Sequence, residues 1–221
     1  MITNCQNSGM AVSADDYAWV NDFSALTEAY CAVLVRGITV EDFLRGMRAE
    51  PQGTVTGYAE LERRTWRLWE EHSGDLLPIG AVTVPGDQGE WVLGLETNGY
   101  LGVTPRLVEP LSRGTRLVSH FCDENAHDNF LWYEDGTLRT SFEPLFPDER
   151  DGSTPDELVG LMEEVGFVLD ENEEELLEDP PTVEAAFALA ERLTGVHITP
   201  DLLTKATYAF GVVPHTETRD P

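Results

Sequence analysis

The sequence predicts an α+β fold, in which a mostly antiparallel sheet from the middle of the chain is flanked by N-terminal and C-terminal helices. Two observations lead to this class. Near both ends, apolar residues recur at helical spacing behind residues that commonly cap helices. The middle instead holds short runs rich in β-branched and aromatic residues, separated by turn signals. Such strands, with helices segregated to the two ends of the chain, favour α+β over α/β.

Three helices are predicted before the sheet. The first covers residues 17–35, where apolar side chains recur at spacings of three and four, namely Trp19, Phe23, Leu26, Tyr30 and Val33. The second covers residues 40–48, and Thr39 is its expected N-cap. A break follows at Pro51, Gly53 and Gly57. The third, a polar helix, covers residues 58–72.

Five short strands are predicted in the middle of the chain. They cover residues 79–84, 91–96, 116–121, 129–133 and 138–142. The strongest turn signal is Asp135-Gly136, because this dipeptide suits the tight turn of a hairpin. A short helix over residues 105–111 interrupts the series.

Three more helices are predicted after the sheet. Thr154 is expected to cap the first, with Pro155 at its first helical position. The second covers residues 183–193 and ends at Gly195. The last is expected to open at Thr199-Pro200 and to extend through residue 210.

The chain is predicted to be a single domain. This α+β domain covers residues 15–213, with an acidic loop at about residues 168–181, and disordered segments are predicted at residues 1–14 and 214–221. A length of 221 residues with 41% hydrophobic residues suffices for a sizeable core. The polar start, the lack of a long apolar run and three widely spaced cysteines lead us to expect a cytoplasmic location.

Charge is the strongest feature of the composition. The chain carries 41 acidic and 14 basic residues, a formal net charge of −27, and its single lysine is Lys205. Phosphate backbones and anionic membranes repel such a chain, so we expect neither a nucleic-acid nor a membrane partner. A basic protein is the expected partner. The alternative is that the acidic residues serve only solubility.

The densest acidic segment covers residues 170–179 and precedes Pro180-Pro181. It is interpreted as a docking strip for a basic partner or, alternatively, as a solvated and repulsive loop. The docking interpretation names Asp170, Glu171, Glu173, Glu174, Glu175, Glu178 and Asp179.

Two tryptophans on the polar helix are further candidates for partner binding. Trp66 and Trp69 are three residues apart and therefore lie on one side of the helix. Leu61, Thr65 and Leu68 lie on another side. Exposed tryptophan beside arginine has the composition of an interface. The alternative is that both tryptophans belong to the core.

No motif of high catalytic specificity is present. The chain lacks a glycine-rich nucleotide loop, a zinc-protease helix motif and a nucleophile elbow. We therefore predict no catalytic residue and no cofactor, and we lean against an enzyme. A small-ligand pocket between the sheet and the helix at residues 105–112 is an alternative. Its candidate residues are Glu96, Asn98, Arg113, Arg116, His120 and Glu143.

Metal binding has only weak support in the sequence. His120, Cys122 and His127 come closest to a ligand set, but zinc sites usually show tighter paired spacing. A buried thiol with two half-exposed histidines is the plainer interpretation. The acidic segment also lacks the glycine and the final glutamate of a calcium-binding loop. We predict no metal site.

Four motifs within residues 17–213 carry a resemblance to a known family. They are W-x-x-G-L-E-x-N-G-Y-x-G at 91–102, L-S-R-G-T-R-x-V-S at 111–119, F-E-P-x-F-P at 142–147 and A-L-A-E-R-L-T-G-V at 188–196. In these motifs the chain resembles an uncharacterised actinobacterial family built on a domain of unknown function. The resemblance implies membership but no activity, ligand or catalytic residue.

Three functions therefore remain open. We expect first a non-catalytic acidic binding protein for a basic protein partner, such as an immunity-type inhibitor or a regulatory adaptor. The alternatives are an enzyme or small-ligand-binding domain, and a structural subunit of a larger assembly. A deep cleft in which the ligand candidates converge would favour the enzyme or ligand-binding domain.

Overall fold

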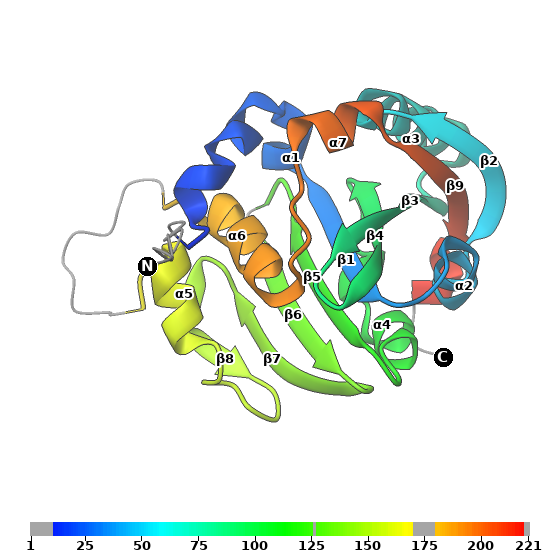
Figure 1. Cartoon of the computed structure of the whole chain (residues 1–221). Coiled ribbons are helices and arrows are strands. Elements are labelled where there is room, and N and C mark those ends of the chain that lie inside the picture. Colours follow the sequence, from blue (N-terminus) through cyan, green and yellow to red (C-terminus); the bar gives the residue numbers. More distant parts are fainter. Residues whose placement is uncertain (1–10, 126, 170–179, 219–221) are drawn as a thin grey trace, which may run out of the picture.

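The computed structural model describes residues 11–125, 127–169 and 180–218 (Figure 1). Its strands are β1 (Tyr30–Arg36), β2 (Glu50–Thr56), β3 (Leu76–Gly86), β4 (Gly89–Thr97), β5 (Arg116–Cys122), β6 (Asp128–Glu134), β7 (Thr137–Glu143), β8 (Phe146–Asp151) and β9 (Thr207–Pro214). Within the described residues they form one antiparallel nine-stranded sheet with the order β2-β9-β3-β4-β1-β5-β6-β7-β8. Edge strands are therefore β2 and β8.

Helices cover both faces of this sheet, which confirms the predicted α+β class (Figure 1). They are η1 (Ala14–Asp22), α1 (Ser24–Glu28), α2 (Val40–Gly46), α3 (Tyr58–His72), η2 (Leu101–Val103), α4 (Pro105–Leu111), α5 (Val159–Val165), α6 (Thr182–Thr194), α7 (Pro200–Lys205) and η3 (His215–Thr218). Among the described residues, no helix has both the length and the apolar character needed to cross a membrane.

Two hydrophobic clusters lie on opposite faces of the sheet, because side chains alternate along each strand. The central strand β1 is buried on both sides. Its Tyr30, Ala32 and Leu34 pack under η1, α3, α5, α6 and α7, on what we call the α6 face. Its Val33 and Val35 pack under α2, η2 and α4, on what we call the α4 face.

Several predicted elements are confirmed by the structure. The helices expected at 40–48, 58–72, 105–111 and 183–193 correspond to α2, α3, α4 and α6, and the five expected strands correspond to β3, β4, β5, β6 and β7. The Thr39 hydroxyl accepts a hydrogen bond from the Asp42 backbone N–H at 3.1 Å, as a helix N-cap does. Gly195 ends α6 in the left-handed conformation, with a φ of 68°.

Other elements correct the sequence analysis. The helix expected over residues 17–35 is wrong in its second half, where the chain forms the central strand β1 after η1 and α1. The last expected helix stops at α7, and the following residues form β9. The break expected near residue 53 is the edge strand β2, and β8 was not expected. The helix expected from Pro155 begins later, at Val159, because residues 155–158 form turns.

The end of the chain also differs from expectation. Pro214 closes β9, and His215–Thr218 form η3, so the described part of the predicted tail belongs to the fold. His215 holds this segment in place, since its Nε2 lies 2.8 Å from the Tyr100 hydroxyl.

Close packing at Gly94 supports a first prediction. A Cβ at this position in β4 would lie 2.3 Å from Phe43 Cζ and 2.8 Å from Val33 Cγ1. We expect Gly94→Ala to lower the free energy of unfolding by about 2–3 kcal/mol through overpacking, as measured by urea denaturation. Gly160→Ala is the matched control, because nothing lies within 4 Å of its Cβ position and alanine favours helix α5. Equal stability of the two variants would contradict the prediction.

Candidate functional site

The outer side of α3 carries two exposed tryptophans. Tyr58, Leu61 and Thr65 of this helix are buried against the α6 face. Trp66 and Trp69 point away from the core and are 43% and 49% exposed. Their rings meet edge to face, with centroids 6.1 Å apart and an interplanar angle of 76°. The pair therefore forms one preformed aromatic surface. The structure shows that both tryptophans are exposed and do not belong to the core.

Charged residues surround this aromatic pair. Residues 50–75 carry six acids and three arginines. Arg63 forms an ion pair with Glu60 one turn away. Arg64 donates to the Gln52 carbonyl at 2.8 Å and lies over the Phe210 ring, so it is part of the packing. The surroundings of the tryptophans are thus acidic on balance.

A solvent-open hollow of about 420 Å³ adjoins the N-terminus of α3. Its lining residues are Thr56, Gly57, Tyr58, Ala59, Glu60, Arg63 and Thr204. Ala59, Arg63 and Trp66 follow one another at spacings of four and three, so they lie in one row along the helix. We call Ala59, Arg63, Trp66, Arg67, Trp69 and Glu70 the α3 outer face. It runs from the hollow to the aromatic pair.

The predicted acidic strip at residues 170–179 is not among the residues that the structure describes. Asp170, Glu171, Glu173, Glu174, Glu175, Glu178 and Asp179 lie outside the described residues.

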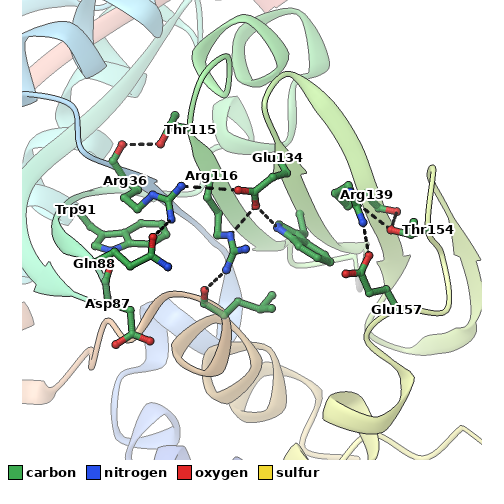
Figure 2. Close-up of polar contacts among 12 residues, drawn as sticks. Arg36, Asp87, Gln88, Trp91, Thr115, Arg116, Glu134, Arg139, Thr154 and Glu157 are labelled. Atoms are coloured by element: carbon green, nitrogen blue, oxygen red, sulfur yellow. Dashed lines mark hydrogen bonds and ion pairs between the residues drawn. The ribbon is translucent and has the colours of Figure 1, made fainter.

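Arg116, a ligand candidate, belongs instead to a cluster of arginine and tryptophan side chains (Figure 2). Its Nε donates to Glu134 at 2.7 Å, and a terminal nitrogen of Arg36 lies 3.7 Å from the same carboxylate. The Trp132 ring lies between two guanidinium groups, those of Arg116 and Arg139, each 5.4 Å from its centroid. Each charge in this cluster therefore has a partner within the chain.

This cluster holds the C-terminal end of α6 on the sheet. Arg116 also donates to the Leu193 carbonyl at 2.9 Å (Figure 2). The Asp87 backbone N–H donates to the Thr194 carbonyl at 2.7 Å. Helix C-termini carry partial negative charge, which a guanidinium group stabilises. On these contacts Arg116 is a structural residue that joins β5 to α6.

Glu96, another ligand candidate, is fully buried on the α4 face. Its two carboxylate oxygens accept from the backbone N–H groups of Leu101 and Gly102, each at 3.2 Å. Register pairs Cys31 of β1 with Glu96, and the Cys31 Sγ lies 3.9 Å from the Ser119 Oγ. Burial raises the pKa of Glu96 to about 8, although the hydrogen bonds from η2 oppose this shift. The carboxyl group anchors η2 to the sheet.

His120 is also fully buried, but on the α6 face. Its Nδ1 lies 2.8 Å from the Tyr30 hydroxyl, and its ring meets Phe187 of α6 edge to face at 4.5 Å. Burial lowers the pKa of His120 to about 3, so the ring is neutral. Its Nε2 has no hydrogen-bond partner among the described residues. Because neighbouring aromatic rings surround it, His120 is a core residue.

The remaining ligand candidates do not join either buried group. Asn98 is an exposed turn residue with a φ of 67°, and Arg113 is exposed at the end of α4, 3.8 Å from Glu109. Glu143 is exposed on β7. Since Glu96 and His120 lie on opposite faces of the sheet, the structure does not bring the six candidates together in one pocket.

The histidines and cysteines that were considered for metal binding are also dispersed. His127 is exposed and contacts Asp123 at 3.1 Å, whereas His120 is buried. Burial raises the pKa of the Cys122 thiol to about 11, which disfavours a reactive thiolate. In residues 11–125, 127–169 and 180–218, no three such side chains are placed to hold a metal ion.

Sequence reasoning missed one exposed apolar feature, the turn between β7 and β8. Leu145 and Phe146 there are 37% and 57% exposed. The sequence does carry a signal for this exposure. Leu145 and Phe146 lie between two prolines and several acids, a pattern that is unusual for a buried strand.

No curated protein and no solved structure matches the chain. The model of a family of unknown function, DUF6461, matches residues 10–218 and therefore nearly the whole chain. The chain belongs to this family of unknown function, DUF6461.

Proposed function

We propose that this chain is a non-catalytic acidic binding protein that docks a basic protein partner on its α3 outer face, as an immunity-type inhibitor or a regulatory adaptor would. The observation that carries the proposal is the exposed pair of Trp66 and Trp69, in edge-to-face contact. Tryptophans dominate the energetic centres of protein interfaces because they bury a large area at a small entropic cost.

The charge of the chain supports the choice of partner. A net charge of −27 creates a field that attracts cationic proteins and speeds their association. Acids outnumber arginines on and around α3, and Arg63 and Arg64 are engaged by the chain itself. The negative potential around α3 would therefore attract a cationic partner whose apolar side chains pack on the two tryptophans.

The placement of the titratable groups supports a non-catalytic role. Glu96 and His120 have the strongly shifted pKa values that active sites often show, but they lie under opposite helix layers. Glu96 anchors η2, and His120 packs against aromatic rings. Neither group opens onto the hollow beside α3.

A pull-down with the double variant Trp66→Ser/Trp69→Ser tests this proposal. We expect the wild-type chain to retain a cationic protein from host lysate at low salt and to release it at high salt. The double variant should retain at least about tenfold less of the same protein, since central interface tryptophans contribute about 2 kcal/mol or more each. Both side chains are exposed, so thermal unfolding of the variant should match that of the wild type.

The matched control is Phe146→Ser, which removes an exposed aromatic ring from the opposite edge of the sheet. It should retain this partner at the wild-type level. Retention that is insensitive to salt, or equal for the wild type and the tryptophan variant, would rule the proposal out.

A further inference from the structure

A second exposed surface lies at the β8 edge of the sheet, away from the helices that the described residues place on the α4 face. The helices of the α4 face, α2, η2 and α4, pack over β1, β2, β3, β5 and β6. Phe146 stands directly opposite Glu143 in the β7–β8 register, and Ser141 stands opposite Asp151. Cross-strand partners share a face, so these four side chains point to the same side. Phe146 is 57% exposed there.

Acidic residues surround this aromatic ring. Residues 143–151, which include β8, carry four acids and a single base, Arg150. The Arg150 side chain is only 16% exposed, and its guanidinium group donates hydrogen bonds to Asp156 and to the Pro147 carbonyl. Glu143, Asp148 and Glu149 are exposed beside Leu145 and Phe146. We call these five residues the β8 tip surface, which has an apolar centre and an anionic rim.

We propose that the β8 tip surface is a second docking site, for a cationic protein segment that inserts an apolar side chain beside Phe146. Charge complementarity selects this occupant, since lysine or arginine side chains would neutralise the rim. A second copy of the chain would bring two anionic rims together, which is unfavourable. The inference rests on the proposed binding role but uses a different surface.

The backbone of β8 indicates that the contact is made through side chains. Pro147 has no N–H to donate, and the register shifts between Phe142 and Glu143, so the ladder is interrupted beside Pro147. Such an edge resists the addition of another strand. An amphipathic helix that lays its apolar side on Phe146 is therefore the expected form of the partner.

The two surfaces lie at opposite edges of the sheet. α3 packs against β2 and β3, and β2 is one edge strand, whereas β8 is the other. Two proteins could thus bind at the same time without contact. This arrangement favours an adaptor that joins two cationic proteins over an inhibitor that blocks one.

A synthetic amphipathic helical peptide of leucine and lysine serves as the probe. Its binding is measured by fluorescence anisotropy of a labelled peptide, at low salt, with the full chain. We expect Leu145→Ser/Phe146→Ser to weaken binding about tenfold through loss of the apolar centre. The triple variant Glu143→Gln/Asp148→Asn/Glu149→Gln should weaken binding to a similar extent through loss of the rim.

Two controls separate this site from general charge and from α3. The triple variant Asp15→Asn/Asp22→Asn/Glu28→Gln removes the same number of exposed charges elsewhere. The charge control should bind the peptide within about twofold of the wild type. Because the α3 outer face is itself proposed as a docking site, the effect of Leu145→Ser/Phe146→Ser is also measured in the Trp66→Ser/Trp69→Ser background, where it should persist. Thermal unfolding of each variant verifies its fold.

Three results would overturn the second site. The wild type could fail to bind the peptide, the two triple variants could weaken it equally, or the apolar variant could bind like the wild type. Loss of binding only in the tryptophan variant would also overturn it, while leaving the α3 outer face as the docking site. Failure of the α3 proposal alone would show in the pull-down and would not alter the peptide result.

Discussion

Glu96→Ala is expected to lower the free energy of unfolding by about 3–5 kcal/mol at pH 5. The substitution removes the acceptor for the N–H groups of Leu101 and Gly102, which are buried residues of η2. An unpaired buried N–H costs about 1–3 kcal/mol, and the lost side chain leaves a cavity beside Cys31. The loss at this residue should therefore be among the largest for any single side chain.

The size of this loss should depend on pH in a defined direction. Burial raises the pKa of Glu96 from 4.5 to about 8 in the folded chain. Between these values the folded state holds a proton that the unfolded state releases, so stability falls as the pH rises. The contribution of Glu96 is complete below about pH 4.5 and is lost as the pH rises toward 8, at up to about 1.4 kcal/mol per pH unit.

Urea denaturation of the wild type and Glu96→Ala at pH 5, 6.5 and 8 measures this dependence. The stability difference between them should shrink as the pH rises. Ser153→Ala is a suitable control, since it removes a hydrogen bond to the Leu138 carbonyl without removing an ionisable group. A difference that grows with pH would mean that the N–H groups of η2 hold an ionised carboxylate, contrary to the assigned pKa.

The helices with polar sides were predictable from the sequence, whereas the fully buried strands were not. In α3, polar residues alternate with apolar ones at helical spacing, so its period is visible. β1 is buried on both faces, and its run from Cys31 to Val35 is apolar throughout. Such a run fits a helix or a strand equally well. The same ambiguity explains why a helix was predicted over the first residues of β9.

The two edge strands escaped prediction for the opposite reason. β2 contains Pro51 and Gly53, and β8 is mostly charged, so neither resembles a core strand. Edge strands tolerate proline and charge because one side of their backbone has no partner to bond, and charge there prevents aggregation. Only the pairing of β2 with β9 and of β8 with β7 identifies them.

The candidate site was predictable only in part. Helical spacing places Trp66 and Trp69 on one side of α3, but the buried Leu61 and Thr65 decide that this side faces solvent. Glu96 and His120 were both singled out, yet their opposite faces depend on the register of β4 and β5 with β1. Register between strands that are distant in sequence is set by tertiary packing, which no local pattern records.

His120 is expected to cause the second large effect, a loss of folding stability at acidic pH. Burial lowers its pKa from 6.5 to about 3, so the folded chain keeps the ring neutral while the unfolded chain takes up a proton below pH 6.5. The contribution of His120 to the free energy of unfolding is complete above pH 6.5 and is lost as the pH falls toward 3. At pH 4.5 the loss amounts to about 2–3 kcal/mol. Asp128, whose pKa burial raises to about 6, acts in the opposite direction.

Replacing both partners of the buried hydrogen bond isolates the contribution of His120. His120→Phe alone leaves the Tyr30 hydroxyl unpaired and should cost about 1–3 kcal/mol at pH 7. Tyr30→Phe/His120→Phe leaves no unpaired group and should lie within about 1 kcal/mol of the wild type at pH 7. At pH 4.5 the free energy of unfolding of the double variant should exceed that of the wild type by about 2 kcal/mol. The double variant lacks the buried imidazole that the unfolded wild type protonates and the folded wild type does not.

Urea denaturation of the three proteins at pH 7, 5.5 and 4.5 makes this comparison, with Tyr30→Phe as the single-variant control. Asp128 remains in every variant, so its contribution largely cancels in the differences. The gain of the double variant should appear only below pH 6.5, and Tyr30→Phe alone should show no such gain. A difference from the wild type that stays constant between pH 7 and 4.5 would show that His120 is protonated in the folded chain, which its apolar surroundings disfavour.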